Sequence, residues 1–231
     1  ETIGGDVAEL RPGSDEALRF RDAMIAAGRW SPYLEVGLGP DAEIFTKASP
    51  MSAVGTGMPV GIRSDSDWNN PEPEVVLACA SDGRVVGATL GNDVNLRDWE
   101  GRSALLLGRA KDNRGSAAIG PFIRLFDRHL GGDFDLDVVR HETVTLDVEG
   151  VGDGFTLRED CSMERISRDP EDLASQLFDG HDWPDGVVLY LGTMFAPTQD
   201  RPRADGAVVP GDGFTHHVGD RVRISSPHLG S

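Results

Sequence analysis

The chain has 231 residues, of which 39% are hydrophobic and 26% are charged, so it can bury the core of one large or two modest domains. Its formal net charge of −17 disfavours binding to nucleic acids and to anionic membranes, both of which attract basic surfaces. No apolar run approaches the roughly 20 residues that cross a bilayer, the first ten residues lack the apolar core of a signal peptide, and two distant cysteines do not make a disulfide framework. We therefore expect a cytoplasmic protein.

The N-terminal part of the chain predicts one helix followed by irregular structure. Residues 14–30 have a helical apolar stripe that starts after Ser14, a suitable N-cap, and ends near Gly28. Residues 31–58 are rich in Pro, Gly and Ser, and within them the segment "AEIFTKASP" reads as a short strand that stops before Pro50. Alternation along that strand would place Glu43, Phe45 and Lys47 on one face.

From Val60 onward the pattern is that of β-structure. Short runs rich in Val, Ile and Leu are separated by turn residues, and Asp82-Gly83 suits a type I′ hairpin turn. A second hairpin is expected from "TVTLDVEG" and "FTLRED", and a helix from "DPEDLASQLFD", capped by Asp169. The remaining expected strands are "PVGIRS", "EVVLACAS", "RVVGATLGNDV", "SAAIGPFIRLF", "GVVLYLGT" and "RVRISS". The fold class is therefore α+β and β-dominated, with a few peripheral helices.

Three acidic residues form a candidate metal site. Glu72 and Glu74 are two residues apart at the start of a strand, so their carboxylates point to the same side. Pairing across a turn at Gly83 brings Asp93 approximately opposite residue 73. Three carboxylates in dry surroundings repel one another unless a cation lies between them, and oxygen ligands suit Mg²⁺, Mn²⁺ or Ca²⁺. A solvated strand start would explain the two glutamates alone.

Lysine is rare in this chain, since Lys47 and Lys111 are the only two among 22 Lys and Arg residues. Lys111 is expected in a Gly/Ser-rich loop, where it is either a counter-charge for an anionic substrate or a solvated surface residue. Glu43 and Lys47 form either part of a site or a surface ion pair. Gly192 and Thr193 could place a backbone N–H and a hydroxyl beside an anion.

Several ordered motifs resemble the fumarylacetoacetate hydrolase family, and most of all its sugar-acid branch, the 2-keto-3-deoxy-pentonate (arabinonate or xylonate) dehydratases. The motifs are "EIFTKASPMSAVGTG", "NNPEPEVVLACASDGRVVGATLGNDVNLRD", "LLLGRAKDNRGSAAIGPFI" and "LGTMFAP". The resemblance runs from about residue 35 to the C-terminus. It implies a mixed β-roll or sandwich, with residues 35–231 as the catalytic domain and residues 1–34 as the helical remnant of a longer N-terminal region.

The resemblance also implies roles for individual residues. The metal ligands of the family correspond to Glu72, Glu74 and Asp93, and the expected ion is Mg²⁺, with Mn²⁺ or Ca²⁺ as possible substitutes. Proton transfer is expected from Glu43, and Lys111 is expected to be catalytic. Substrate-binding roles are expected for Arg97, Thr193 and Lys47.

The implied activity is the Mg²⁺-dependent dehydration of a 2-keto-3-deoxy sugar acid to 2-oxoglutarate semialdehyde through a metal-stabilised enolate, in a homodimer or homotetramer. The first alternative is C–C bond hydrolysis of an acylpyruvate or 2,4-diketo acid, which in the family uses a histidine on an N-terminal lid, and this chain has no histidine before Glu72. The second alternative is a non-catalytic acidic protein that binds cations.

Overall fold

The computed structural model describes residues 10–202 and 206–231, so residues 1–9 of the expected N-terminal segment lie outside the described residues. The predicted first helix is confirmed as α1 (Asp15–Ala26), and the Ser14 hydroxyl accepts a hydrogen bond from the N–H of Ala17. A second helix, α2 (Pro32–Leu38), lies where irregular structure was expected. It begins like a well-capped helix, because Ser31 accepts from the N–H of Leu34 and a proline occupies the first helical turn.

A mixed six-stranded sheet forms the centre of the molecule. Its strand order is β1-β6-β4-β3-β10, with β7 paired to β4, and every pair is antiparallel except β1 with β6. The bounds are β1 (Val54–Gly55), β3 (Pro73–Cys79), β4 (Val85–Asp93), β6 (Ala117–Ile119), β7 (Arg124–Leu125) and β10 (Val187–Tyr190). Every residue of β3 is buried, as its unbroken apolar run predicts for a central strand.

The β3–β4 hairpin is confirmed, but its turn and its register differ from the prediction. Gly83 has a φ of +84°, whereas no other residue type in the described chain has a positive φ, so the turn is not of type I′. The N–H of Gly83 bonds to the carbonyl of Ala80, which makes a longer turn that ends in a left-handed glycine. Together with a register shift at Ala78 and Cys79, this turn pairs Pro73 with Asn92, one residue away from the expected partner.

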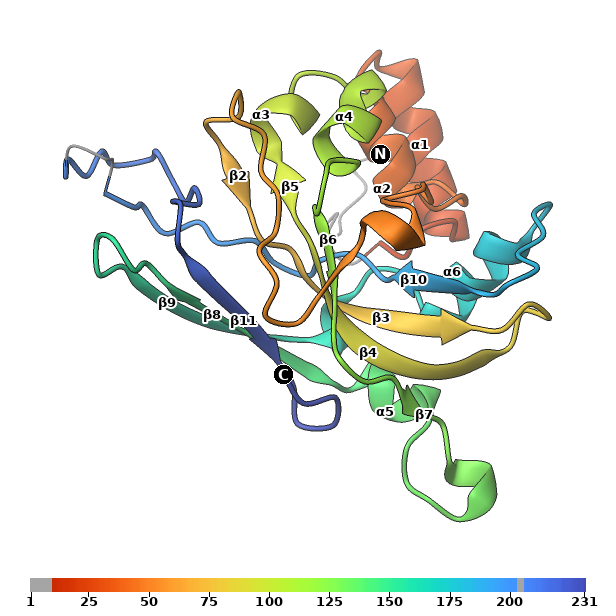
Figure 1. Cartoon of the computed structure of the whole chain (residues 1–231). Coiled ribbons are helices and arrows are strands. Elements are labelled where there is room, and N and C mark those ends of the chain that lie inside the picture. Colours follow the sequence, from red (N-terminus) through yellow and green to blue (C-terminus); the bar gives the residue numbers. More distant parts are fainter. Residues whose placement is uncertain (1–9, 203–205) are drawn as a thin grey trace.

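A second, three-stranded antiparallel sheet has the order β11-β8-β9. Its strands are β8 (Thr143–Glu149), β9 (Thr156–Ser162) and β11 (Arg221–Ser225), and β8 with β9 is the predicted second hairpin. A small ladder joins β2 (Asn69–Asn70) to β5 (Asn95–Leu96). Figure 1 shows the three-stranded sheet beside the six-stranded one, with α1 and α2 gathered on one side of β3 and β10.

The other helices are short and lie at the periphery. The predicted helix after Asp169 is confirmed as α6, with the Asp169 carboxylate accepting from the N–H of Glu171. The bounds are η2 (Pro50–Ser52), α3 (Arg97–Glu100), η3 (Ala104–Leu106), α4 (Leu107–Lys111), η4 (Arg128–Leu130), α5 (Leu136–Arg140), η5 (Met163–Arg165) and α6 (Pro170–Phe178). None of the helices in the described part of the chain is long and apolar enough to cross a membrane.

Two predicted strands are wrong. Residues 42–49 and 59–64 pair with no strand in the described structure and form irregular segments instead. The first is held by side chains, since the N–H of Ala42 bonds to Gln176 Oε1 and the Lys47 side chain points into the interior. The N–H of Gly61 bonds to the carbonyl of Gly115 in a loop. Alternating side chains therefore do not make a strand where no neighbouring strand offers a ladder.

The main core lies on the face of β3 and β4 that carries Val75, Leu77 and Leu90. Phe134 and Met163, from the segments that follow, complete it without exposure to solvent. Both cysteines are buried free thiols. The division at residue 34 stays a prediction, and α2 extends across that position.

Candidate metal centre

Three buried carboxylates meet at the end of the β3–β4 hairpin. Glu72 directly precedes β3, Glu74 belongs to β3, and Asp93 is the last residue of β4. Their side chains offer oxygens that all lie within 4.8 Å of one another, and none of the three residues is more than 6% exposed. A hydrogen bond of 3.0 Å from the N–H of Asp93 to the carbonyl of Glu72 sets their relative position. The structure thus brings together the three acids that the spacing predicted.

Both lysines of the chain point into this cluster. Lys111 Nζ forms ion pairs with Glu72 Oε2 and, at 3.0 Å, with Asp93 Oδ2. Lys47 Nζ lies 2.9 Å from Asp93 Oδ1 and donates hydrogen bonds to the carbonyls of Val94 and Lys111 and to Ser116 Oγ. Lys111 is the last residue of helix α4, not a loop residue, because Leu107–Lys111 completes a helical turn. A solvated surface position is therefore wrong for Lys111, and Lys47 pairs with the buried Asp93 and not with Glu43 at the surface.

The electrostatics of the cluster are those of a site with surplus negative charge. Burial, followed by the charges of Asp93 and Glu72, raises the pKa of Glu74 well above its ordinary value. Burial also acts to lower the pKa of Lys111, but Glu72 and Asp93 outweigh it and raise that pKa. Two ammonium groups face three carboxylates, so one negative charge has no counter-charge within the cluster.

The donor set fits a small divalent cation. Asp93 Oδ1 is buried, and its one close partner among the described residues is the Lys47 ammonium at 2.9 Å, which also donates to other acceptors. Glu74 receives the N–H of Gly192 at 2.8 Å on Oε2, which orients its carboxylate. A cluster made only of carboxylate oxygens, with orienting hydrogen bonds, suits Mg²⁺ better than zinc, which favours His and Cys.

Glu43 is an exposed residue whose charge interacts with groups of this region. Partial burial, followed by the charge of Glu100, raises the pKa of Glu43, and the positive charge of Lys111 opposes that rise. Glu43 therefore stands within electrostatic reach of Glu100 and of the buried lysine. A carboxyl group with a raised pKa at the edge of a site can carry a proton to or from a bound molecule.

The two other expected substrate-binding residues have contacts outside the carboxylate cluster. The Arg97 guanidinium stacks over the Trp68 ring, 5.1 Å from its centre. The Thr193 hydroxyl donates to the carbonyl of Phe195 at 2.5 Å, so it orders the loop after β10. The anion beside the N–H of Gly192 is the protein's own Glu74.

Two residues of the site were not predicted from the sequence. Asn95 is fully buried in β5, and its side-chain amide contacts both Glu72 and Glu100. Glu100 ends helix α3 and is half-buried. Their position directly after Asp93, in "NDVNLRDWE", was the available signal, because a strand end and the helix after it stay close to the preceding ligand.

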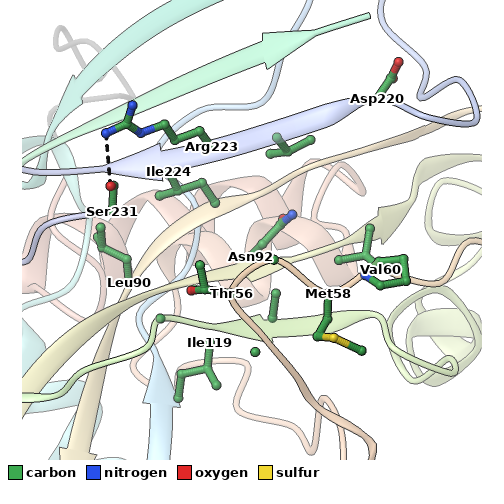
Figure 2. A pocket seen from close by; sticks show the side chains of 17 residues that line it. Thr56, Met58, Val60, Leu90, Asn92, Ile119, Asp220, Arg223, Ile224 and Ser231 are labelled. Atoms are coloured by element: carbon green, nitrogen blue, oxygen red, sulfur yellow. Dashed lines mark hydrogen bonds between the residues drawn. The ribbon is translucent and has the colours of Figure 1, made fainter. Parts of the chain in front are cut away.

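A separate cavity of about 240 Å³ lies between β4, β6 and β11 (Figure 2). The described residues that line it include Thr56, Met58, Asn92 and Arg223, but neither the three carboxylates nor the two lysines. Asn92 links the cavity to the cluster, because its Oδ1 accepts the N–H of Glu72 at 3.0 Å. We therefore place the candidate chemistry at the carboxylates and not in this cavity.

Comparison with known proteins gave no match to a family model. The chain is 33% identical over 167 residues to the 2-dehydro-3-deoxy-D-arabinonate dehydratase of Saccharolobus solfataricus. The matched region covers 72% of this chain and 53% of the relative. It is 30% identical over 199 residues to a probable 2-keto-3-deoxyxylonate dehydratase of Haloferax volcanii, covering 86% of this chain and 61% of the relative.

The chain is similar to the sugar-acid dehydratases. A solved 2-keto-3-deoxy-D-arabinonate dehydratase, complexed with magnesium and 2,5-dioxopentanoate, superimposes with a TM-score of 0.67 at 30% identity, over 87% of this chain and 64% of that one. The resemblance stated from the motifs is confirmed. The chain spans between about half and two thirds of the length of these relatives.

More distant neighbours agree on the fold. A fumarylacetoacetate hydrolase from Exiguobacterium antarcticum superimposes with a TM-score of 0.56 at 21% identity, over 79% of this chain and 62% of that one. The predicted β-dominated α+β fold of the fumarylacetoacetate hydrolase type is therefore confirmed.

Proposed function

We propose that the protein dehydrates a 2-keto-3-deoxy pentonate to 2,5-dioxopentanoate, which is 2-oxoglutarate semialdehyde, with the help of Mg²⁺. The observation that carries the proposal is the buried cluster of Glu72, Glu74 and Asp93 beside Lys111, with Glu43 within electrostatic reach of that lysine. Its support from outside the chain is the similarity to two dehydratases of such acids, and to a solved 2-keto-3-deoxy-D-arabinonate dehydratase complexed with magnesium and 2,5-dioxopentanoate.

The three carboxylates would hold the cation. Bound there, Mg²⁺ supplies Lewis-acid polarisation of a keto group next to a carboxylate. Glu74 is held for this task by the N–H of Gly192, and Glu72 by Lys111 and Asn95. Three protein ligands leave open positions for the two oxygens of a 2-keto acid.

The acid–base work falls to Glu43. Dehydration removes a proton from C3 of the substrate and expels the C4 hydroxyl as water, which leaves a C3=C4 double bond conjugated to the keto group. Loss of a C5 proton and return of a proton to C3 then give the C4=C5 enol, which takes up a proton at C4 and loses its hydroxyl proton to form the C5 aldehyde. Glu43 would receive the C3 proton and deliver a proton to the leaving hydroxyl, for which a raised pKa is an advantage. The Lys111 ammonium would face the negative charge that develops on the keto oxygen.

Roles for the remaining expected residues complete the proposal. Lys47 would hold Asp93 in place, at 2.9 Å, and support substrate binding through that carboxylate. Arg97 and Thr193 keep their expected substrate-binding roles as proposals, as do the homodimer or homotetramer and the cytoplasmic location.

The reaction products test the proposal. The protein would be incubated with 2-keto-3-deoxy-xylonate, 2-keto-3-deoxy-arabinonate and an acylpyruvate, with Mg²⁺ or with EDTA. We expect Mg²⁺-dependent release of the semialdehyde from a pentonate. Release of pyruvate from the acylpyruvate would instead support C–C hydrolysis, and no Mg²⁺-dependent turnover of any of them would overturn an enzymatic role.

The Glu43→Gln variant tests the assigned acid. It keeps the size of the side chain but removes its proton transfer, so we expect turnover to fall at least about 100-fold while Mg²⁺ binding stays unchanged. Glu16→Gln is the matched control, since Glu16 is an exposed residue of α1 whose one ion pair within residues 10–202 and 206–231 is with Arg19. Equal turnover of the Glu43 variant and the control would remove Glu43 from the mechanism.

A further inference from the structure

The side-chain amide of Asn95 connects two carboxylates at the centre of the site. Asn95 Nδ2 donates one hydrogen bond to Glu72 Oε1 at 2.8 Å and another to Glu100 Oε2 at 2.7 Å. An amide nitrogen has two hydrogens, so both are used. The residue is 0% exposed, and β5 places it two positions after Asp93.

The orientation of this amide is dictated by charge. Asn95 Oδ1 is buried without a hydrogen-bond partner among the described residues, which is an unfavourable state for a carbonyl oxygen. The opposite orientation would direct that oxygen at two carboxylates and would leave the N–H groups unpaired. Hydrogen bonds to ionised acceptors are about twice as strong as neutral ones, so they outweigh the orphaned oxygen.

Glu100 is the fourth carboxylate of this region. It forms no ion pair with any lysine or arginine in the part of the chain that the structure describes, yet its charge acts on Glu43 and Lys111. The Asn95 amide group bridges Glu100 Oε2 and the Glu72 carboxylate through two hydrogen bonds. A carboxylate so placed is a potential additional ligand for a cation held by the three acids.

We propose that Asn95 is a positioning residue that fixes Glu72 as a ligand and keeps Glu100 outside the ligand set of the cation. Three carboxylates and open positions suit the small, octahedral Mg²⁺ and its keto-acid substrate, whereas a fourth, flexible carboxylate favours the larger Ca²⁺. Asn95 would thus set the selectivity of the site for its cation. This inference rests on the metal site of the proposed function.

Metal titration tests the inference without the need for turnover. The dissociation constants for MgCl₂ and CaCl₂ would be measured by calorimetry for the wild-type protein and for Asn95→Leu, which keeps the volume but donates no hydrogen bond. We expect Mg²⁺ binding to weaken about tenfold because Glu72 is no longer oriented. Ca²⁺ binding should weaken less, because Glu100 becomes available, so the ratio of the Mg²⁺ to the Ca²⁺ constant rises.

The double variant Asn95→Leu/Glu100→Gln identifies the cause. Without a carboxylate at position 100, the ratio should return to its wild-type value while Mg²⁺ binding stays weak. Asn69→Ser is the matched control, because Asn69 is a buried amide in the paired strand β2 that contacts Ser66 and His216 but none of the carboxylates. Should Asn95→Leu fail to fold, Asn95→Ser, which donates one hydrogen instead of two, should shift the ratio in the same direction.

The outcomes separate this inference from the proposed function. If the wild-type protein binds neither cation, the metal site is wrong and the role of Asn95 falls with it. If the wild-type protein binds Mg²⁺ but the ratio is the same in the Asn95 variants and in the control, the metal site stands and the inference is overturned. A raised ratio that persists in the double variant would equally overturn it, because Glu100 would then not be the added ligand.

Discussion

Replacing Glu74 by glutamine should make the metal-free protein more stable and at the same time abolish its stabilisation by Mg²⁺. Glu74 is 2% exposed, and one of its carboxylate oxygens lies within 4.8 Å of a carboxylate oxygen of Glu72 and of Asp93. Without a cation, its charge is buried beside two like charges. Glutamine has nearly the same shape and can still accept the N–H of Gly192.

The magnitude follows from the distances. Two unit charges 4.8 Å apart repel by about 3 kcal/mol at an effective dielectric constant of about 20. Lys111 attracts Glu74, and protonation of Glu74 relieves a part of the repulsion, which its raised pKa reflects. We therefore expect Glu74→Gln to raise the free energy of unfolding in EDTA by about 1–2 kcal/mol. With Mg²⁺ at 100 times its dissociation constant, the wild-type protein should gain about 2.7 kcal/mol and the variant almost nothing.

Urea unfolding in EDTA and in excess Mg²⁺, followed by tryptophan fluorescence, gives both numbers. Glu16→Gln removes the same charge from an exposed position and should change neither. The reasoning is refuted if Glu74→Gln is less stable than the wild-type protein in EDTA, or if Mg²⁺ stabilises both proteins equally.

Three further predictions concern buried groups. Lys111→Met leaves Glu72 and Asp93 without their shared counter-charge and should lower the free energy of unfolding by about 3 kcal/mol; an unchanged urea midpoint would contradict it. Burial lowers the pKa of His216 to about 4, so as the pH falls the unfolded chain binds a proton at a higher pH than the folded one does. The free energy of unfolding should therefore fall by about 3 kcal/mol between pH 6.5 and pH 4. A His216→Asn variant should lose that part of the pH dependence in urea unfolding, and an identical pH profile would show that His216 is not its source. A Cβ at Gly91 would collide with the Tyr190 ring. Gly91→Ala should therefore lower the free energy of unfolding by about 2 kcal/mol, which a lower melting temperature would report. An unchanged melting temperature would argue against this close contact.

The hairpin that carries the candidate ligands was predictable because its signals are local. The two-residue period of a strand places Glu72 and Glu74 on one side, and the turn residues after Ala80 return the chain toward Asp93. The exact register was missed by one residue, since the type of turn and the shift at Ala78 depend on how the two strands pack and not on their composition.

The irregular segments were predicted less well. The segment around Glu43 alternates like a strand, but no strand lies beside it, and long-range contacts such as that of Ala42 with Gln176 decide its path. Helix α2 was missed although Ser31 and Pro32 were a suitable start, because a helix of seven residues has too little periodicity to stand out.

The sequence by itself determined which residues could form an oxygen-rich site, because carboxylates two residues apart and a returning strand depend only on backbone period and turn chemistry. Only the tertiary structure decided which charges face those carboxylates. Lys47 and Lys111 reach Asp93 from segments that are distant in the sequence, and Asn95 separates Glu72 from Glu100 through two hydrogen bonds. Such contacts arise from the packing of elements against one another. The pKa values of the charged groups in the site depend on how deeply each group is buried, and no local sequence pattern encodes that burial.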